Sequence, residues 1–260
     1  MTLAPGEVRQ LQLDFIRGFI RWLGTASEGA VSWEAPGLSA AVVPMAGERS
    51  IINSVIPDGS AALRDGYDDL ARAYLGAGVV AWTVWIHEED ADARRFLEQR
   101  GHSFDGAPVA MTVELSGRPP GEVGGLDWDS DATFEELGRI NDLAYGYEPA
   151  TGMANALLAP EQDLPIRLYR ARAEGETACV LGTLDVGSDA GILFVATKPG
   201  LRERGLASRL LAAALAEAEE RGMTTSSLQA SALGSPIYER LGYLKRFSFH
   251  IMERHFQAQS

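Results

Sequence analysis

The chain has 260 residues, a length that suggests one or two domains. Apolar residues make up 46% and charged residues 23%, a globular composition that excludes a wholly disordered chain. The net charge of −13 argues against a protein that wraps nucleic acid or an anionic membrane, so neither is an expected partner. The single cysteine, Cys179, excludes an internal disulfide, and no Cys/His spacing predicts a metal site.

The first residues lack the basic and apolar regions of a signal peptide. No stretch approaches the roughly 18 apolar residues that a membrane span needs. We therefore expect a soluble protein of a reducing compartment, most simply the cytoplasm.

Helical and strand patterns alternate along the first half. Apolar residues recur every three or four positions over residues 7–23, and the polar face mixes both charges, which predicts a core-facing helix rather than a membrane-surface one. Further helices are expected at 66–76 and 90–100, the latter ending at Gly101. Strands are expected at 37–45, 50–55, 79–86 and 109–115. The Gly- and Pro-rich residues 117–125 predict a linker.

The elements start again beyond this linker. A helix is expected over 131–145, capped by Asp131, with a short helix at 155–159. Strands are expected at 167–173, 177–185, 190–197, 224–230 and 247–252. Two more helices are expected at 206–221 and 235–241. The pattern predicts an α/β (α+β) chain of two halves, with domains at 1–117 and 125–260.

The connection between the strand that ends near Thr197 and the helix that begins at Leu206 has the chemistry of a phosphate site. Free N–H groups and the positive end of a helix dipole lie beside Gly205, where a ligand can approach the backbone closely. Basic residues outnumber acidic ones here, in an otherwise acidic chain: Lys198, Arg202, Arg204 and Arg209 against Glu203. This favours a soluble polyphosphate ligand over a polymer. The alternative is an ordinary connection with solvated arginines.

Two motifs carry a family resemblance. Residues 202–207, Arg-Glu-Arg-Gly-Leu-Ala, resemble the Gln/Arg-x-x-Gly-x-Gly/Ala signature of the GCN5-related N-acetyltransferase (GNAT) superfamily. Residues 234–243, GSPIYERLGY, resemble its second hallmark, a helix tyrosine followed by Leu-Gly-aromatic. The order of elements over 126–254 is also similar. The resemblance implies a GNAT acetyltransferase domain at 125–260 that uses acetyl-CoA, or another acyl-CoA, and no metal.

The same resemblance implies how the acyl-CoA would be held. Backbone amides from Arg204 to Ser208 would bind its pyrophosphate, and Arg202 would pair with a phosphate or shape the loop. The end of the strand at Val195–Thr197 would hydrogen-bond the pantetheine. The implied cofactor-binding residues are Val195, Ala196, Thr197, Arg202, Glu203, Arg204, Gly205, Leu206, Ala207 and Ser208.

The resemblance implies direct attack of a primary amine on the thioester in a ternary complex, with a backbone N–H near Val195 stabilising the oxyanion. Tyr238 matches the family's general acid, and a tyrosine is still protonated at neutral pH. The alternative for Tyr238 is an aromatic side chain that packs in the core. The general base stays open between Asp142, Glu148, Asp185 and a water chain.

The acceptor is expected to be a small-molecule or peptide amine. Tyr145, Tyr147 and Glu148 lie between the first two helices of the second domain, where this family usually builds its acceptor pocket. Both tyrosines fit plain loop aromatics equally well. Cys179 is expected to be a small buried residue rather than a nucleophile.

The first half resembles a degenerate copy of the second. The run from residue 93, ARRFLEQRGHSFDGAPVAMTVEL, parallels the run from residue 235, SPIYERLGYLKRFSFHIMERHF, which predicts a tandem GNAT-like arrangement. Each half would then be a mixed, mostly antiparallel sheet flanked by helices. Coincidental similarity in the order of helices and strands is the alternative.

The first half lacks the acyl-CoA signature. Residues 56–70, IPDGSAALRDGYDDL, stand in its place, and the predicted helix start carries carboxylates that oppose a pyrophosphate, those of Asp65, Asp68 and Asp69. Phe96 or Arg95 stands near the tyrosine's place. This half is therefore expected not to bind CoA, and to shape the acceptor pocket or supply a homodimer surface. Its tryptophans are more readily core residues than groove residues: Trp33, Trp82 and Trp85.

The leading hypothesis is an N-acetyltransferase. The alternative from another class is a non-catalytic sensor or regulatory protein that holds acyl-CoA on a GNAT fold. A third interpretation is an unrelated phosphate-binding domain, which predicts no stabilisation by CoA.

Overall fold

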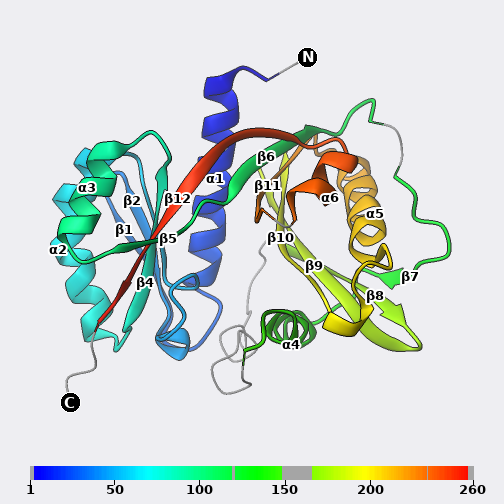
Figure 1. The fold of residues 1–260 in the computed structure, drawn as a ribbon, viewed down its shortest axis with the longest axis horizontal. Helices are drawn as coiled ribbons and strands as arrows, with labels where there is room; N and C mark the ends of the chain where they lie inside the picture. Colours follow the sequence, from blue (N-terminus) through cyan, green and yellow to red (C-terminus); the bar gives the residue numbers. More distant parts are fainter. Residues whose placement is uncertain (1–2, 119–120, 148–165, 233, 257–260) are drawn as a thin grey trace. The chain divides into compact units, whose positions relative to one another are not determined.

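The computed structural model describes residues 3–118, 121–147, 166–232 and 234–256 (Figure 1). The chain forms two compact units. Unit 1 takes the chain up to Phe15 and most of the chain from Ala110 to Arg246. Unit 2 takes Ile16–Val109 and the chain from Phe247 onward.

Unit 2 is a mixed sheet with helices packed on it. Its strands follow the order β1-β2-β3-β4-β12, with β5 paired to β12. β3 and β4 are parallel, and the other pairs are antiparallel. The strands are β1 (Val31–Ala35), β2 (Leu38–Val42), β3 (Ser54–Pro57), β4 (Ala81–His87), β5 (Ser103–Gly106) and β12 (Leu244–His255). The helices are the second part of α1 (Pro5–Leu23), η1 (Pro44–Ala46), α2 (Ser60–Gly76) and α3 (Ala91–Gln99).

The core of unit 2 lies between its sheet and the helices α2 and α3 (Figure 1). Tyr67 and Tyr74 lie two turns apart on the same face of α2, and both rings pack against the ring of Trp82 in β4. Alternate residues of β4, among them Val84 and Ile86, point to the same face, as the period of a strand requires. The tryptophans Trp82 and Trp85 are buried, as expected for core residues.

Unit 1 is also a mixed sheet, in the order β6-β11-β10-β9-β8-β7. β10 and β11 are parallel, whereas β7–β8, β8–β9 and β9–β10 are antiparallel. The strands are β6 (Val109–Glu114), β7 (Asp127–Asp129), β8 (Ile166–Ala173), β9 (Glu176–Val186), β10 (Asp189–Thr197) and β11 (Thr225–Ala230). The helices are the start of α1, α4 (Phe134–Tyr145), η4 (Pro199–Leu201), α5 (Leu206–Glu220) and α6 (Ser235–Arg240).

Helices α4 and α5 cover opposite faces of this sheet. Tyr169 and Arg170 are successive residues of β8, so their side chains point to opposite faces. Arg170 pairs with Glu136 of α4, and Tyr169 accepts a hydrogen bond from Arg221 at the end of α5. The sheet is thus flanked by helices on both faces, which confirms the predicted fold class.

The long, strongly periodic elements lie within a few residues of their predicted places, except that α2, predicted at 66–76, begins at Ser60. Three short strands were not predicted: β1, β5 and β7, of three to five residues each. Thr133, not Asp131, caps α4, and it forms a capping box with Glu136. The helix predicted at 155–159 lies outside the described residues.

The compact units differ from the predicted domains 1–117 and 125–260 at both ends of the chain. In unit 1 the Phe15 ring lies so close to β10 that a Cβ at Gly191 would be 2.1 Å from it, and Gln12 donates to the Met111 carbonyl (2.9 Å). In unit 2 the residues of β12 from Phe249 to His255 pair with β4 throughout. The start of α1 therefore belongs with the second half, and the end of β12 with the first.

Candidate functional site

The end of β10 departs from regular pairing at the positions expected to meet the pantetheine. Its parallel ladder with β11 covers Asp189, Ala190 and Gly191. The register with β9 then shifts between Leu193 and Ala196, and Phe194 within the bulge has a positive φ of 51°. Val195–Thr197 consequently lie beyond the paired part of β11, while Ala196 and Thr197 stay paired to β9.

The connection from β10 to α5 presents backbone amides. After the short helix η4, the residues from Arg202 to Gly205 are exposed. Glu203 and Gly205 both have positive φ, 65° and 72°, and Gly205 caps α5 with no side-chain hydrogen bond. No acidic residue lies in the first turn of α5. The N–H groups there keep their affinity for an anion, strengthened by the helix dipole.

The other loop residues divide between core and surface. Leu206 is buried and anchors α5, whereas Ala207 and Ser208 are half-buried. The Ser208 hydroxyl donates to the Gly205 carbonyl (3.1 Å). The Arg202 guanidinium donates to the carbonyl of Ala144 in the last turn of α4 (2.5 Å), a contact that shapes the loop.

Tyr238 on α6 lies near two other residues that the sequence singled out. Burial raises the pKa of its phenol well above the usual value, and nearby Tyr145 and Cys179 add to the rise. Cys179 accepts a hydrogen bond from the hydroxyl of Thr197 (3.2 Å). The end of α4, the end of β10 and the tyrosine of α6 therefore meet in one neighbourhood.

The second tyrosine of this motif has a different environment. The Tyr243 ring meets the Tyr238 ring at 5.9 Å, edge to face, and its hydroxyl shares a 2.7 Å hydrogen bond with Ser226. Tyr243 is fully buried, and burial raises the pKa of its phenol far above the usual value. Tyr243 is thus a core residue, and Tyr238 is the tyrosine that borders the site.

Comparison with known proteins places this neighbourhood in a family. Residues 185–245, which run from the end of β9 to the start of β12, match the model of the acetyltransferase (GNAT) domain. This part of the chain is therefore similar to the GNAT domain. The family is one of acetyltransferases, and the resemblance that the two motifs carry is confirmed.

Solved structures with this fold cover nearly the whole chain. A GCN5-related N-acetyltransferase from Kribbella flavida is 17% identical with a TM-score of 0.66, covering 98% of this chain and 96% of its own. One from Sphaerobacter thermophilus is 15% identical with a TM-score of 0.59, covering 98% and 95%. A tandem GNAT protein from the clavulanic acid biosynthesis pathway is 12% identical with a TM-score of 0.56, covering 95% and 89%. No curated protein matches the chain significantly.

The structure places the candidate general bases in different surroundings. Asp185 binds Arg221 through two hydrogen bonds of 3.0 and 3.1 Å. It pairs with Ala190, seven positions before Thr197, so it lies roughly 20 Å along the strand from the end of β10. This placement removes Asp185 as a base. Asp142 is buried in α4, and Glu148 lies outside the described residues.

The expected acceptor residues lie at the end of α4. Tyr145 closes the helix with 66% of its surface exposed, and Tyr147 follows Gly146 with 42% exposed. Cys179 is buried, as expected, and burial raises the pKa of its thiol to about 11. It therefore stays a thiol at neutral pH, and is a poor nucleophile.

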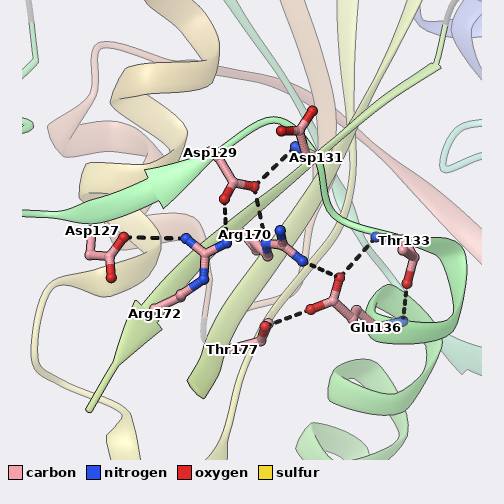
Figure 2. A network of polar contacts seen from close by, with 8 residues as sticks. All are labelled: Asp127, Asp129, Asp131, Thr133, Glu136, Arg170, Arg172 and Thr177. Carbon is pink, nitrogen blue, oxygen red and sulfur yellow. Dashed lines mark hydrogen bonds and ion pairs between the residues drawn. The ribbon is translucent and has the colours of Figure 1, made fainter. Parts of the chain in front are cut away.

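A polar network that the sequence reasoning missed holds the start of α4 (Figure 2). Glu136 accepts hydrogen bonds from the Thr133 N–H (3.0 Å), Arg170 (2.7 Å) and the Thr177 hydroxyl (2.7 Å). Burial opposes ionisation of Glu136, but these donors outweigh it and lower the pKa. The Thr-x-x-Glu spacing of the capping box is the signal that the sequence offers for this cluster.

The network continues across β7 and β8. Asp129 pairs with Arg170 (3.0 Å) and with Arg172, which also reaches Asp127 (3.2 Å). Burial opposes ionisation of Asp129 too, and the bonds from Arg172, the Asp131 N–H and Arg170 lower its pKa below the usual value. These ion pairs between carboxylates and arginines fix the start of α4 to the sheet. They thereby also position Tyr145, the exposed tyrosine at the other end of the helix.

The place in unit 2 that corresponds to the loop is built differently. α2 begins at Ser60, earlier than predicted, so Asp65, Asp68 and Asp69 lie inside the helix rather than at its start. The prediction that these carboxylates lie at the start of the helix, where they would repel a pyrophosphate, is therefore wrong. Only Asp58 and Gly59 join β3 to α2, and Asp58 forms an ion pair with Arg17.

The residues near the tyrosine's place in unit 2 serve packing. Phe96 meets the Tyr67 ring edge-on at 5.3 Å, and Arg95 pairs with Asp92 on the surface of α3. Trp33 is half-buried against the core.

No group of three or more His, Cys, Asp or Glu side chains among the described residues is placed to hold a metal ion. No helix in that part of the chain is both long enough and apolar enough to cross a bilayer.

Proposed function

We propose that this protein is an N-acetyltransferase that moves the acetyl group of acetyl-CoA, or the acyl group of another acyl-CoA, to a primary amine. The observation that carries the proposal is the exposed amide loop before α5, where no side chain caps the helix, directly after the strand β10 bulges and parts from β11. A diphosphate fits the loop, because its ligands are N–H groups at the positive end of a helix.

The acyl-CoA lies along β10 in this proposal. Backbone groups of Val195, Ala196 and Thr197 bond the pantetheine as an added strand partner would, since β11 does not pair with them. The amides from Arg204 to Ser208 hold the pyrophosphate. Arg202 and Glu203 shape the loop, Leu206 anchors it and Ala207 keeps the contact small.

The neutral amine attacks the thioester carbonyl directly, in a ternary complex. A backbone N–H beside Val195 stabilises the oxyanion, and the bulge at Phe194 sets the direction of this peptide. Tyr238 then donates its phenol proton to the leaving thiolate. Its raised pKa keeps that proton in place throughout the neutral range.

The acceptor enters at the end of α4, where Tyr145 and Tyr147 are exposed. Asp142, Glu148 or a chain of waters takes the proton that the amine loses. Unit 2 binds no CoA in this proposal, because two residues between β3 and α2 leave no amide loop there. It serves instead to complete the acceptor site or to pair two copies of the chain.

Two measurements test the proposal. Isothermal calorimetry with CoA should show binding, and a thiol-release assay over a panel of primary amines should show turnover. Binding without turnover on any amine would favour the sensor. Absence of CoA binding would favour an unrelated phosphate-binding domain, or a domain that binds no phosphate at all.

Tyr238→Phe tests the proton donor. The ring and its contact with Tyr243 remain, so stability and CoA affinity should be unchanged, while turnover falls by about a hundredfold. Tyr243→Phe is the matched control, because it removes the same atom from a hydroxyl that bonds Ser226 in the core. It should lower stability and leave the chemical step intact. Equal turnover in Tyr238→Phe and the unaltered protein would exclude the assigned role.

A further inference from the structure

Arg209, in the first turn of α5, bends back over the loop and donates to three backbone carbonyls. Its Nε contacts the Gly205 carbonyl, its Nη2 the Arg204 carbonyl and its Nη1 the Gly124 carbonyl, each at 3.3 Å. A planar guanidinium can serve three acceptors at once because its donors point in fixed, divergent directions.

Two of these carbonyls belong to the peptide units that supply loop amides. The Arg204 carbonyl shares a plane with the Gly205 N–H, and the Gly205 carbonyl shares one with the Leu206 N–H. In a trans peptide the C=O and the N–H point in opposite directions. Drawing both carbonyls toward Arg209 therefore turns both N–H groups away from it, on the side where an anion would be held.

The loop needs such an external hold. Glu203 has a positive φ of 65°, a conformation that is strained for a residue with a side chain. The Gly205 carbonyl has further donors in Ser208 Oγ (3.1 Å) and the Arg209 N–H (3.2 Å). For the Arg204 carbonyl, Arg209 is the donor that the structure records, so this peptide depends most on the guanidinium.

The third contact joins the loop to the chain before β7. Gly121 lies against α5 so closely that a Cβ there would be 2.4 Å from the Cβ of Ala212. Gly124 follows in the same stretch and accepts from Arg209. This part of the predicted linker is thus packed on α5, and Arg209 uses it as a fixed point.

We propose that Arg209 is a positioning residue that presets the amides of the pyrophosphate loop through their carbonyls, and that its charge on the phosphates is secondary. The inference rests on the proposed binding of CoA. It predicts that a lysine cannot replace the arginine, although lysine keeps the charge, because one nitrogen on a flexible stem cannot hold three divergent carbonyls. A direct charge effect predicts the opposite.

The test compares Arg209→Lys and Arg209→Met with the unaltered protein. Calorimetry with CoA should show an affinity loss of about tenfold in both variants, with the lysine variant close to the methionine variant. Arg139→Lys, an exposed arginine on α4, is the matched control and should bind CoA normally. Where turnover is measurable, KM for acetyl-CoA should rise while kcat is kept, because the reacting atoms are untouched.

Pantetheine, which has no phosphate, separates the loop from the fold. Its affinity, measured by chemical-shift titration at millimolar concentration, should be the same in all variants. Normal CoA affinity in Arg209→Lys, or loss of pantetheine binding together with CoA binding, overturns the inference. If the unaltered protein binds pantetheine and CoA equally weakly, the proposed function itself fails.

Discussion

Asp189, at the start of β10, should make this protein less stable as pH rises through neutrality. Its side chain is 3% exposed, and Oδ1 accepts hydrogen bonds from the hydroxyls of Thr225 (2.8 Å) and Ser227 (3.2 Å). Oδ2 is buried with no hydrogen-bond partner among the described residues. Burial raises the pKa of Asp189 to about 7, the two hydroxyls oppose the rise, and the charge of Asp185 adds to it.

The sign follows from proton linkage. An aspartate in the unfolded chain has a pKa of about 4, so the folded state binds this proton more tightly. The stability that it contributes is complete below about pH 4 and is lost as pH rises through about 7. A difference of about three pKa units corresponds to about 4 kcal/mol as an upper value.

Asp189→Asn is the perturbation that isolates this carboxyl group. The amide keeps the acceptor for Thr225 and Ser227, stays neutral, and puts an unsatisfied donor in place of Oδ2 at a cost of about 1–3 kcal/mol. The variant should therefore be less stable than the unaltered protein near about pH 4.5 and more stable near about pH 8. Urea unfolding followed by far-UV circular dichroism at both pH values measures the crossing. Parallel pH profiles for the two proteins would refute the reasoning.

Three further perturbations have definite outcomes in urea unfolding. Gly191→Ala should cost about 1–3 kcal/mol, because its Cβ would overlap the Phe15 ring, and Phe15→Leu in the same chain should restore part of the loss. Glu136→Gln should cost about 2–4 kcal/mol, because it leaves Arg170 with Asp129 as its remaining carboxylate partner, and the loss should shrink as pH falls toward the lowered pKa of Glu136 and the carboxylate takes up a proton. Burial lowers the pKa of His102 to about 4, so stability should fall as pH drops from about 6.5 toward 4, and His102→Gln should abolish that fall.

Much of the fold follows from the sequence because its long elements repeat their apolar residues regularly. The helix α5 begins where the pattern places it, at Leu206, with its small and apolar residues buried. β1 was missed because it lies at the edge of the sheet, and its exposed and half-buried positions give no clean alternation. β7 has three residues, too few for any period to show.

The ends of the chain show what local pattern cannot supply. The helix over 7–23 was predicted, but nothing in its own residues says that Phe15 would pack on Gly191 while Arg17 would pair with Asp58. The partners lie far away in the sequence, and they divide one helix between two units.

The candidate site, too, can be predicted from the sequence only in part. The sequence indicates the loop at 202–207 because arginine and glycine at a fixed spacing before a helix form a recognisable motif. From the sequence, Arg209 is only one more positive charge near the loop, because its contact with Gly124 spans 85 positions. The sequence leaves Asp185 open as a base, whereas the register of β9 and β10 places it beside the turn between them, away from Thr197 and bonded to Arg221.

The two units together indicate which feature distinguishes a phosphate loop from an ordinary crossover. Each has a short parallel ladder, two residue pairs in β3–β4 and three in β10–β11, and each follows the first strand with a helix. A parallel pair that separates early is therefore common to both. The difference lies in the connection: Asp58 and Gly59 in unit 2, residues 198–205 in unit 1. The two-residue turn places the carboxylate of Asp58, paired to Arg17, beside the start of α2, whereas the longer loop adds backbone amides before α5, two of them on peptides that Arg209 holds. The proposed binding of a diphosphate therefore depends on the length and the peptide orientation of one connection between a strand and a helix.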